Sequence, residues 1–102
     1  MRNSPAVIIL LKETATAEDI QLLTEEVRKI NGTREVKYIS QEEALRIYKE
    51  QNKNDPVILE LVTEDILPAS LEVYTYDISS KEYQERVAAL AKSKVFVEQV
   101  VI

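Results

Sequence analysis

Residues 40–73 read SQEEALRIYKEQNKNDPVILELVTEDILPASLEV, and this stretch decides the fold. Ser40 is a strong candidate for a helix N-cap, because Glu43 stands where it completes a capping box. Asp55 followed by Pro56 predicts a second helix start, with proline at the first helical position. Pro68 prevents that helix from continuing. We therefore expect residues 41–69 to form a small helical lobe.

The segment before this stretch predicts a strand, a helix and a second strand. The apolar run of residues 6–11 is typical of a central strand that is buried on both faces. Thr16, with Asp19 three residues later, is expected to cap the following helix. Gly32, the only glycine in the chain, stands where a left-handed C-terminal cap is expected. Residues 36–39 follow as a strand.

The segment after the lobe repeats the same order of elements. Residues 71–76 alternate, so that Leu71 and Val73 point to one side of a strand and Tyr74 to the other. Ser79, with Glu82 as its capping-box partner, is expected to start a helix. The chain then ends in a last strand.

Two such units of about 33–35 residues predict an α+β fold, the split βαβ or ferredoxin-like sandwich. We expect a four-stranded antiparallel sheet with two helices on one face. The single domain of residues 1–102 would consist of a sandwich core and an inserted lobe. The core would comprise residues 6–40 and 70–102, with strands at 6–12, 35–40, 70–77 and 94–101 and helices near 17–31 and 80–92.

Composition excludes several classes of function. The chain has no Cys and no His, which removes thiol nucleophiles, thiolate metal sites and imidazole acid–base chemistry. One glycine cannot build a phosphate-binding loop. The net charge of −5 argues against a nucleic-acid partner. We therefore expect no catalytic residue, no cofactor and no metal. An enzyme that uses carboxylates stays open as an alternative, and its pocket should gather two acids from different elements.

The remaining indication of function is the cluster of apolar residues at positions 57–67. A helix of about ten residues in a lobe of about thirty cannot bury all the large aliphatics of residues 57–67 locally. An exposed apolar remainder usually marks a protein–protein site. The predicted protein-binding residues are Tyr48, Val57, Ile58, Leu61, Val62, Ile66 and Leu67.

Two motifs in the chain resemble a known family. Residues 36–45, VKYISQEEAL, are similar to the "YVSKEEAL" stretch of the FtsX family, the permease of the cell-division ABC transporter FtsEX. Residues 66–73, ILPASLEV, are similar to its "PLPASLEV" return strand. The spacing and the flanking strand–helix–strand units also match its large extracellular domain. Asp65 and Ile66 stand where the family often has Asn-Pro.

The resemblance implies a function without chemistry in this domain. Family members have four membrane helices, and this loop lies between the first and the second, on the extracellular or periplasmic side of the cell membrane. An FtsE-type ATPase drives a conformational change through the rest of the permease. The outer domain passes it to a peptidoglycan hydrolase or its coiled-coil activator during cell division. The lobe would carry the apolar contact surface.

A second alternative is a cytosolic ligand-sensing regulatory module with a ferredoxin-like fold. Titration with small metabolites would test it. The chain's longest apolar run, residues 6–11, is far shorter than the roughly 20 residues that span a bilayer, so the membrane helices that the resemblance implies would flank this chain.

Overall fold

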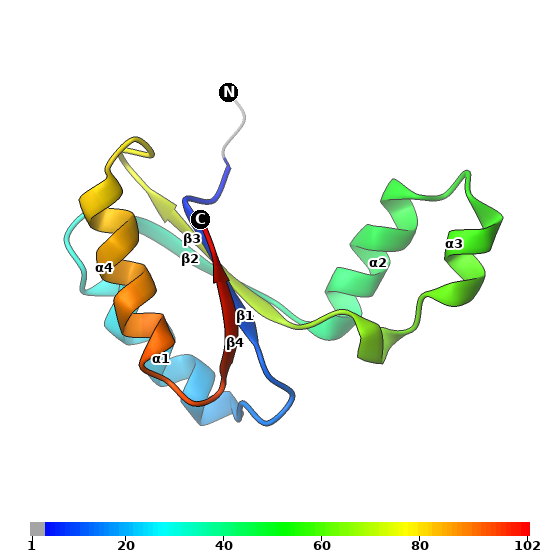
Figure 1. Cartoon of the computed structure of the whole chain (residues 1–102), viewed down its shortest axis with the longest axis horizontal. Coiled ribbons are helices and arrows are strands. Elements are labelled where there is room, and N and C mark those ends of the chain that lie inside the picture. The colour runs from blue at the N-terminus through cyan, green and yellow to red at the C-terminus, as the bar shows by residue number, and fades with distance from the viewer. Residues whose placement is uncertain (1–3) are drawn as a thin grey trace.

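The computed structural model describes residues 4–102, and it forms a sandwich from which a helical lobe projects (Figure 1). The elements in chain order are β1 (Val7–Leu11), α1 (Ala17–Arg28), β2 (Thr33–Ile39), α2 (Gln41–Gln51), α3 (Pro56–Leu61), the 3-10 helix η1 (Glu64–Ile66), β3 (Ser70–Thr75), α4 (Lys81–Lys92) and β4 (Val97–Val101). Within the described residues, no helix is long and apolar enough to cross a membrane.

The four strands form one antiparallel sheet in the order β2-β3-β1-β4. Strand β3 lies between β1 and β2, so each strand–helix–strand unit is split by a strand of the other unit. In the register, Ile9 of β1 lies opposite Leu71 of β3 and Val100 of β4. This is the predicted ferredoxin-like fold, and the structure confirms it.

Helices α1 and α4 cover the same face of the sheet (Figure 1). Their buried residues, among them Leu23 and Val87, meet the strand side chains Val7, Ile9 and Leu71 in one hydrophobic core. Burial of this apolar surface is the main stabilising contribution to the domain. The predicted placement of both long helices on one face is therefore correct.

The prediction that the first strand is buried on both faces is wrong. Strand β1 is central, but buried and half-buried residues alternate along it. Ile8 and Leu10 point to the face that carries no helix, where they are only half-buried beside Glu72 and Ser70 of β3. The sequence shows a continuous apolar run because one half of the run lines the core and the other half lines an apolar groove on the open face.

The predicted caps at Thr16 and Ser40 both hold, the second only in part. Thr16 and Asp19 form the full capping box, with each side chain accepting from the other residue's backbone N–H at 3.0 Å. The Ser40 hydroxyl accepts from the Glu43 N–H at 3.0 Å, but the return bond is missing. The Glu43 carboxylate instead pairs with Arg46 one turn along the helix, at 3.5 Å.

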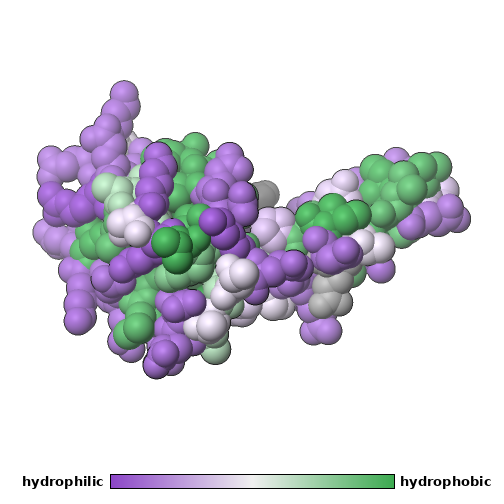
Figure 2. Space-filling model, turned by 60° about the horizontal axis from the view of Figure 1, so that its bottom comes forward, coloured by the Kyte–Doolittle hydropathy of each residue, from purple (hydrophilic) through white to green (hydrophobic). Residues whose placement is uncertain are grey.

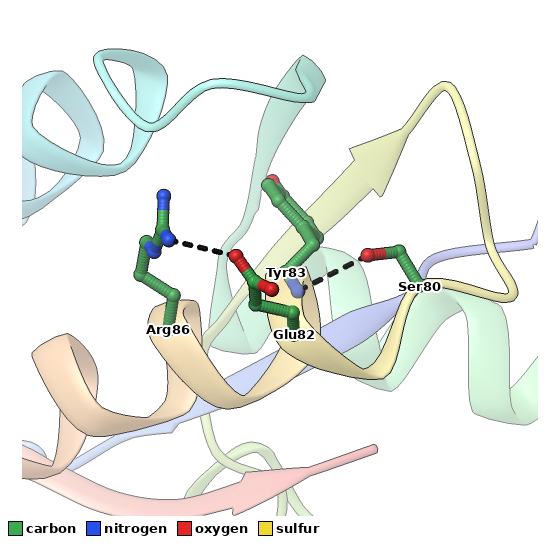
Figure 3. A network of polar contacts seen from close by, with 4 residues as sticks. All are labelled: Ser80, Glu82, Tyr83 and Arg86. Carbon is green, nitrogen blue, oxygen red and sulfur yellow. Dashed lines mark hydrogen bonds and ion pairs between the residues drawn. The ribbon is translucent and has the colours of Figure 1, made fainter.

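The start of α4 lies one residue later than predicted. Figure 3 shows Ser80, whose hydroxyl accepts from the Tyr83 N–H at 3.2 Å, and the ion pair of Glu82 with Arg86 at 3.0 Å. Ser79 instead donates its N–H and its hydroxyl to the Asp77 carboxylate, at 3.1 and 2.6 Å. That turn uses Ser79 before the helix begins, so Ser80 is left to cap it.

Gly32 has the predicted left-handed backbone, with a φ of 107°, but it does not cap α1. The helix already ends at Arg28, with Lys29 as its C-cap. Gly32 instead leads into β2 and accepts from the Thr75 hydroxyl at 2.8 Å. A side chain on it would place a Cβ only 3.1 Å from the Tyr83 ring. Gly32 is therefore required by both its backbone angle and its lack of a side chain.

Replacing Gly32 by alanine is expected to destabilise the domain by about 1–3 kcal/mol, because a side chain at positive φ is strained. The thermal midpoint should fall by about 5 °C or more, as measured by circular dichroism. The control is the neighbouring, exposed Asn31→Ala, which should stay within about 0.5 kcal/mol of the parent. Equal midpoints for the two variants would contradict the argument.

Candidate functional site

The far part of the lobe consists of two short helical segments. Asp55 caps α3 by accepting from the Ile58 N–H at 3.2 Å, and Pro56 is the first helical residue, as the sequence predicts. The helix ends at Leu61, however, because Val62 adopts an extended backbone with φ −87° and ψ 130°. The apolar stretch of residues 57–67 is thus split between α3, a bend and η1 well before Pro68.

The seven predicted binding residues divide into an exposed and a half-buried group. Val57, Leu61 and Ile66 keep 62%, 70% and 59% of their surface accessible to solvent. The half-buried residues are Tyr48, Ile58, Val62 and Leu67. Figure 2 shows the resulting hydrophobic surface on the lobe, with hydrophilic side chains beside it. The role of the seven predicted residues in partner binding stays a prediction.

Five of these residues meet in one shallow cavity of about 230 Å³. Its lining comes from α2, from α3 and its end, and from η1, namely Tyr48, Ile58, Leu61, Val62 and Ile66. Within α2 and α3, which are fully described, no residue is buried. The lobe therefore has too little volume to enclose its own aliphatic side chains, and it presents them to solvent. We call this cavity, together with the exposed Val57 that precedes Ile58 in α3, the lobe surface.

A second apolar groove, of about 250 Å³, lies in the corner between α2 and the open face of the sheet. Ile8 and Leu10 contribute from β1, while Ile47, Tyr48 and Leu67 contribute from the lobe. The sequence does not predict this groove, because it requires Ile8 and Leu10 to face away from the core. Tyr48 lines both hollows and so connects the lobe surface to the sandwich, whereas Leu67 lines only the second.

The base of the lobe is joined to the sandwich by the side chain of Gln41. Its Nε2 donates to the backbone carbonyl of Leu67 at 3.1 Å and lies 3.5 Å from the carboxylate of Glu13. Gln41 thereby ties the first residue of α2 to the chain leaving the lobe and to the loop after β1. A cavity of about 340 Å³ lies beside this junction, with Glu13, Ser40 and Gln41 among its lining residues.

The aromatic residues of β3 offer the main alternative binding surface. The Tyr74 hydroxyl donates to Glu72 at 2.8 Å, and the Arg34 guanidinium lies 5.3 Å from the Tyr74 ring centre. Burial, helped by this bond to Glu72, raises the pKa of the Tyr74 phenol above its usual value. Tyr74 is thus engaged within the sheet, and Tyr76 is exposed just beyond it.

Acidic side chains do not gather into an ion site in the part of the chain that the structure describes. Among the side chains that the structure describes, no group of three or more Asp or Glu residues could hold a metal ion. Glu26, one member of an adjacent acid pair, instead forms an ion pair with Lys94 at 2.9 Å and joins α1 to the turn before β4.

Comparison with known proteins gives one family and one related structure. The model of the FtsX extracellular domain family matches residues 4–101. The crystal structure of extracellular domain 1 of FtsX from S. pneumoniae, in complex with undecyl-maltoside, superposes with a TM-score of 0.70 at 15% identity. The match covers 94% of this chain and 91% of that one, and at this identity it supports the fold alone. No curated protein sequence matches.

The family match spans nearly the whole described chain, so it includes the sandwich and the inserted lobe together. The predicted resemblance to the FtsX family is confirmed. The chain therefore belongs to the family of FtsX extracellular domains, the part of this ABC transporter permease that lies outside the membrane.

Proposed function

We propose that the lobe surface receives an apolar helix of a peptidoglycan hydrolase or of its coiled-coil activator. The observation that carries the proposal is the exposure of Val57, Leu61 and Ile66 on a lobe whose helices α2 and α3 bury no residue. Exposed apolar patches of this kind mark protein–protein sites. A shallow apolar hollow suits the helix-in-groove mode, in which aliphatic anchors of an amphipathic helix enter it.

The domain acts by mechanical coupling rather than by chemistry. ATP hydrolysis in the FtsE-type subunit changes the conformation of the permease, and the outer domain passes this change to the bound hydrolase or activator in cell division. The lobe enters from β2 and returns into β3, which are adjacent strands of the sheet. Movement of the sandwich is therefore transmitted directly to the lobe, with Gln41 holding both of its ends.

The ligand of the related structure is compatible with the proposed apolar site. Undecyl-maltoside, bound to the S. pneumoniae domain, carries an alkyl chain that prefers apolar surroundings. In this chain, we assign the same preference to the lobe surface. A cytosolic ligand-sensing module is disfavoured, because the family's domain lies outside the membrane.

Site-specific photo-crosslinking in the full permease with its ATPase subunit tests the proposal. A photoreactive residue at Leu61 is expected to capture a protein that contains a hydrolase domain or a coiled coil. The matched control is the same probe at Glu85, which is exposed on α4 of the sandwich and should capture none. Capture from Glu85 or Tyr76 but not from Leu61 would place the partner on the sandwich and refute the proposal.

The same experiment separates binding from coupling. A substitution that blocks ATP hydrolysis in the ATPase subunit should leave the Leu61 crosslink in place while peptidoglycan cleavage in cells is lost. Undiminished cleavage in that background would mean that the captured protein does not depend on the permease for its activity, and the coupling role would be wrong.

A further inference from the structure

The charge of the chain is unevenly distributed around the lobe. Between Lys53 and Lys81 the sequence contains no Lys or Arg, yet this interval carries the acids Asp55, Glu60, Glu64, Asp65, Glu72 and Asp77. The first four belong to the part of the lobe that follows α2. The part of the lobe surface built by α3 and η1 therefore lies in a stretch that contains acids and no basic residue, whereas Tyr48 on α2 is followed by Lys49.

The described acids of the lobe that follow α2 carry negative charge that no described cation neutralises. Asp55, Glu60 and Asp65 are exposed, and none of them pairs with a cation of the described residues. Glu60 directly precedes Leu61 and Asp65 directly precedes Ile66, so both adjoin residues that line the cavity. The Thr63 hydroxyl donates to Asp65 at 2.5 Å and holds the pKa of that carboxyl below its usual range.

The basic side chains of the lobe lie on α2 and just after it, and two of them are already paired. Arg46 pairs with Glu43 at 3.5 Å, and Lys53 pairs with Glu50 at 3.4 Å. The side of the lobe surface built by α3 and η1 thus combines exposed aliphatics with unpaired carboxylates. Opposite charge on the partner would be attracted there, and like charge would be repelled.

We propose that the occupant of the lobe surface is an amphipathic helix whose apolar stripe is flanked by Lys or Arg. This inference rests on the proposed function and adds the chemistry of the partner. The stripe fills the cavity between α2, α3 and η1, while the flanking cations approach Glu60 and Asp65. A second copy of this chain is disfavoured, because it would bring two acidic lobe surfaces together. An anionic lipid surface is disfavoured by the same repulsion.

Designed helical peptides test the charge requirement. Three peptides share one apolar stripe and differ only at the flanking positions, which are Lys, Gln or Glu. Affinity for the 102-residue domain is measured by fluorescence anisotropy in low salt and in physiological salt. We expect the order Lys, then Gln, then Glu. The advantage of the Lys peptide should shrink with salt, because exposed charges are screened over about 8–10 Å.

A pair of double variants locates the charge effect. Glu60→Gln with Asp65→Asn removes two charges beside the lobe surface, and the amide that replaces the Asp65 carboxylate can still accept from Thr63. Glu85→Gln with Glu98→Gln removes two exposed charges from the sandwich, neither of which pairs with a cation of the described residues. Both double variants change the parent net charge of −5 by the same amount, so they differ only in where the charges are removed. Only the lobe variant should lose affinity for the Lys peptide, by about threefold or more at low salt.

The outcomes distinguish this inference from the proposed function. If all three peptides bind equally, and Leu61→Asp removes the binding of each, the lobe receives a helix but the charge inference is wrong. An equal loss in both double variants would also overturn it, since the effect would then be one of net charge. If no peptide binds, or anionic vesicles or self-association at high salt occupy the surface instead, both proposals fail.

Discussion

Replacing Leu61 by aspartate is expected to abolish binding of the hydrolase or activator while the fold remains intact. Leu61 is 70% exposed and lines the lobe cavity. Truncation of a central anchor typically costs about 2 kcal/mol or more, which corresponds to a loss of about 30-fold in affinity. An aspartate also leaves an unpaired charge in an apolar contact. Calorimetry with the purified partner measures the loss.

The controls for this prediction concern charge and position. Leu61→Ser should weaken binding in the same direction, which shows that loss of the anchor is sufficient. Tyr76→Asp adds the same charge at an exposed residue beyond β3 and should leave binding unchanged. The thermal midpoint of each variant should stay near that of the parent. Loss of binding with Tyr76→Asp or Tyr74→Asp, but not with Leu61→Asp, would move the site to the sheet.

The choice of Leu61 over its neighbour depends on the structure. Val62 is also one of the seven predicted binding residues, and an aspartate there would leave the thermal midpoint nearly unchanged only if Val62 were exposed. Val62 is half-buried, and its backbone ends α3 by donating to Ile58 at 3.1 Å. An aspartate at Val62 would therefore disturb both packing and binding, whereas one at Leu61 separates the two effects.

Replacing Leu71 by alanine is expected to cause the largest loss of stability among single truncations considered for this chain. Leu71 is fully buried in the inner strand β3, where its register partners are Ile9 and Tyr38. A cavity at such a site costs about 2–5 kcal/mol, a large share of the roughly 5–15 kcal/mol that stabilises a typical domain. The thermal midpoint should fall by about 10 °C or more.

Leu61→Ala is the matched control, because it removes the same atoms from an exposed position. Its thermal midpoint should change little, while its affinity for the partner should fall. The two variants therefore predict opposite patterns: Leu71→Ala loses stability, and Leu61→Ala loses binding. Equal destabilisation by both would show that the lobe surface is part of the core and would contradict the proposed function.

The sequence alone determines the architecture, because the information for it is local. Apolar residues in the helix Ala17–Arg28 recur at helical spacing, and those of β3 alternate. The spacing therefore predicts which face of each element is buried. Thr16, Ser40 and Asp55 mark helix starts through bonds to residues only three positions away. Two similar strand–helix–strand units together predict the ferredoxin-like sandwich.

Local patterns were less reliable where two neighbouring residues compete for one role. Ser79 and Ser80 are both good caps, and the turn at Asp77 decides between them. Gly32 was correctly expected at positive φ, but its position depends on Tyr83 and Thr75, which come from the other unit. The length of α3 likewise followed from the bend at Val62 rather than from propensity.

By itself, the sequence determined the four strands, the two long helices, the inserted lobe and the excess of aliphatic residues within it. Only the tertiary structure decided that Leu61 and Ile66 face solvent while Leu71 and Ile9 are enclosed, and that Ile8 and Leu10 line a groove. The physical reason is that the burial of a side chain depends on which distant elements cover it. Helices α1 and α4 cover one face of the sheet, whereas within the described residues the lobe has no second layer.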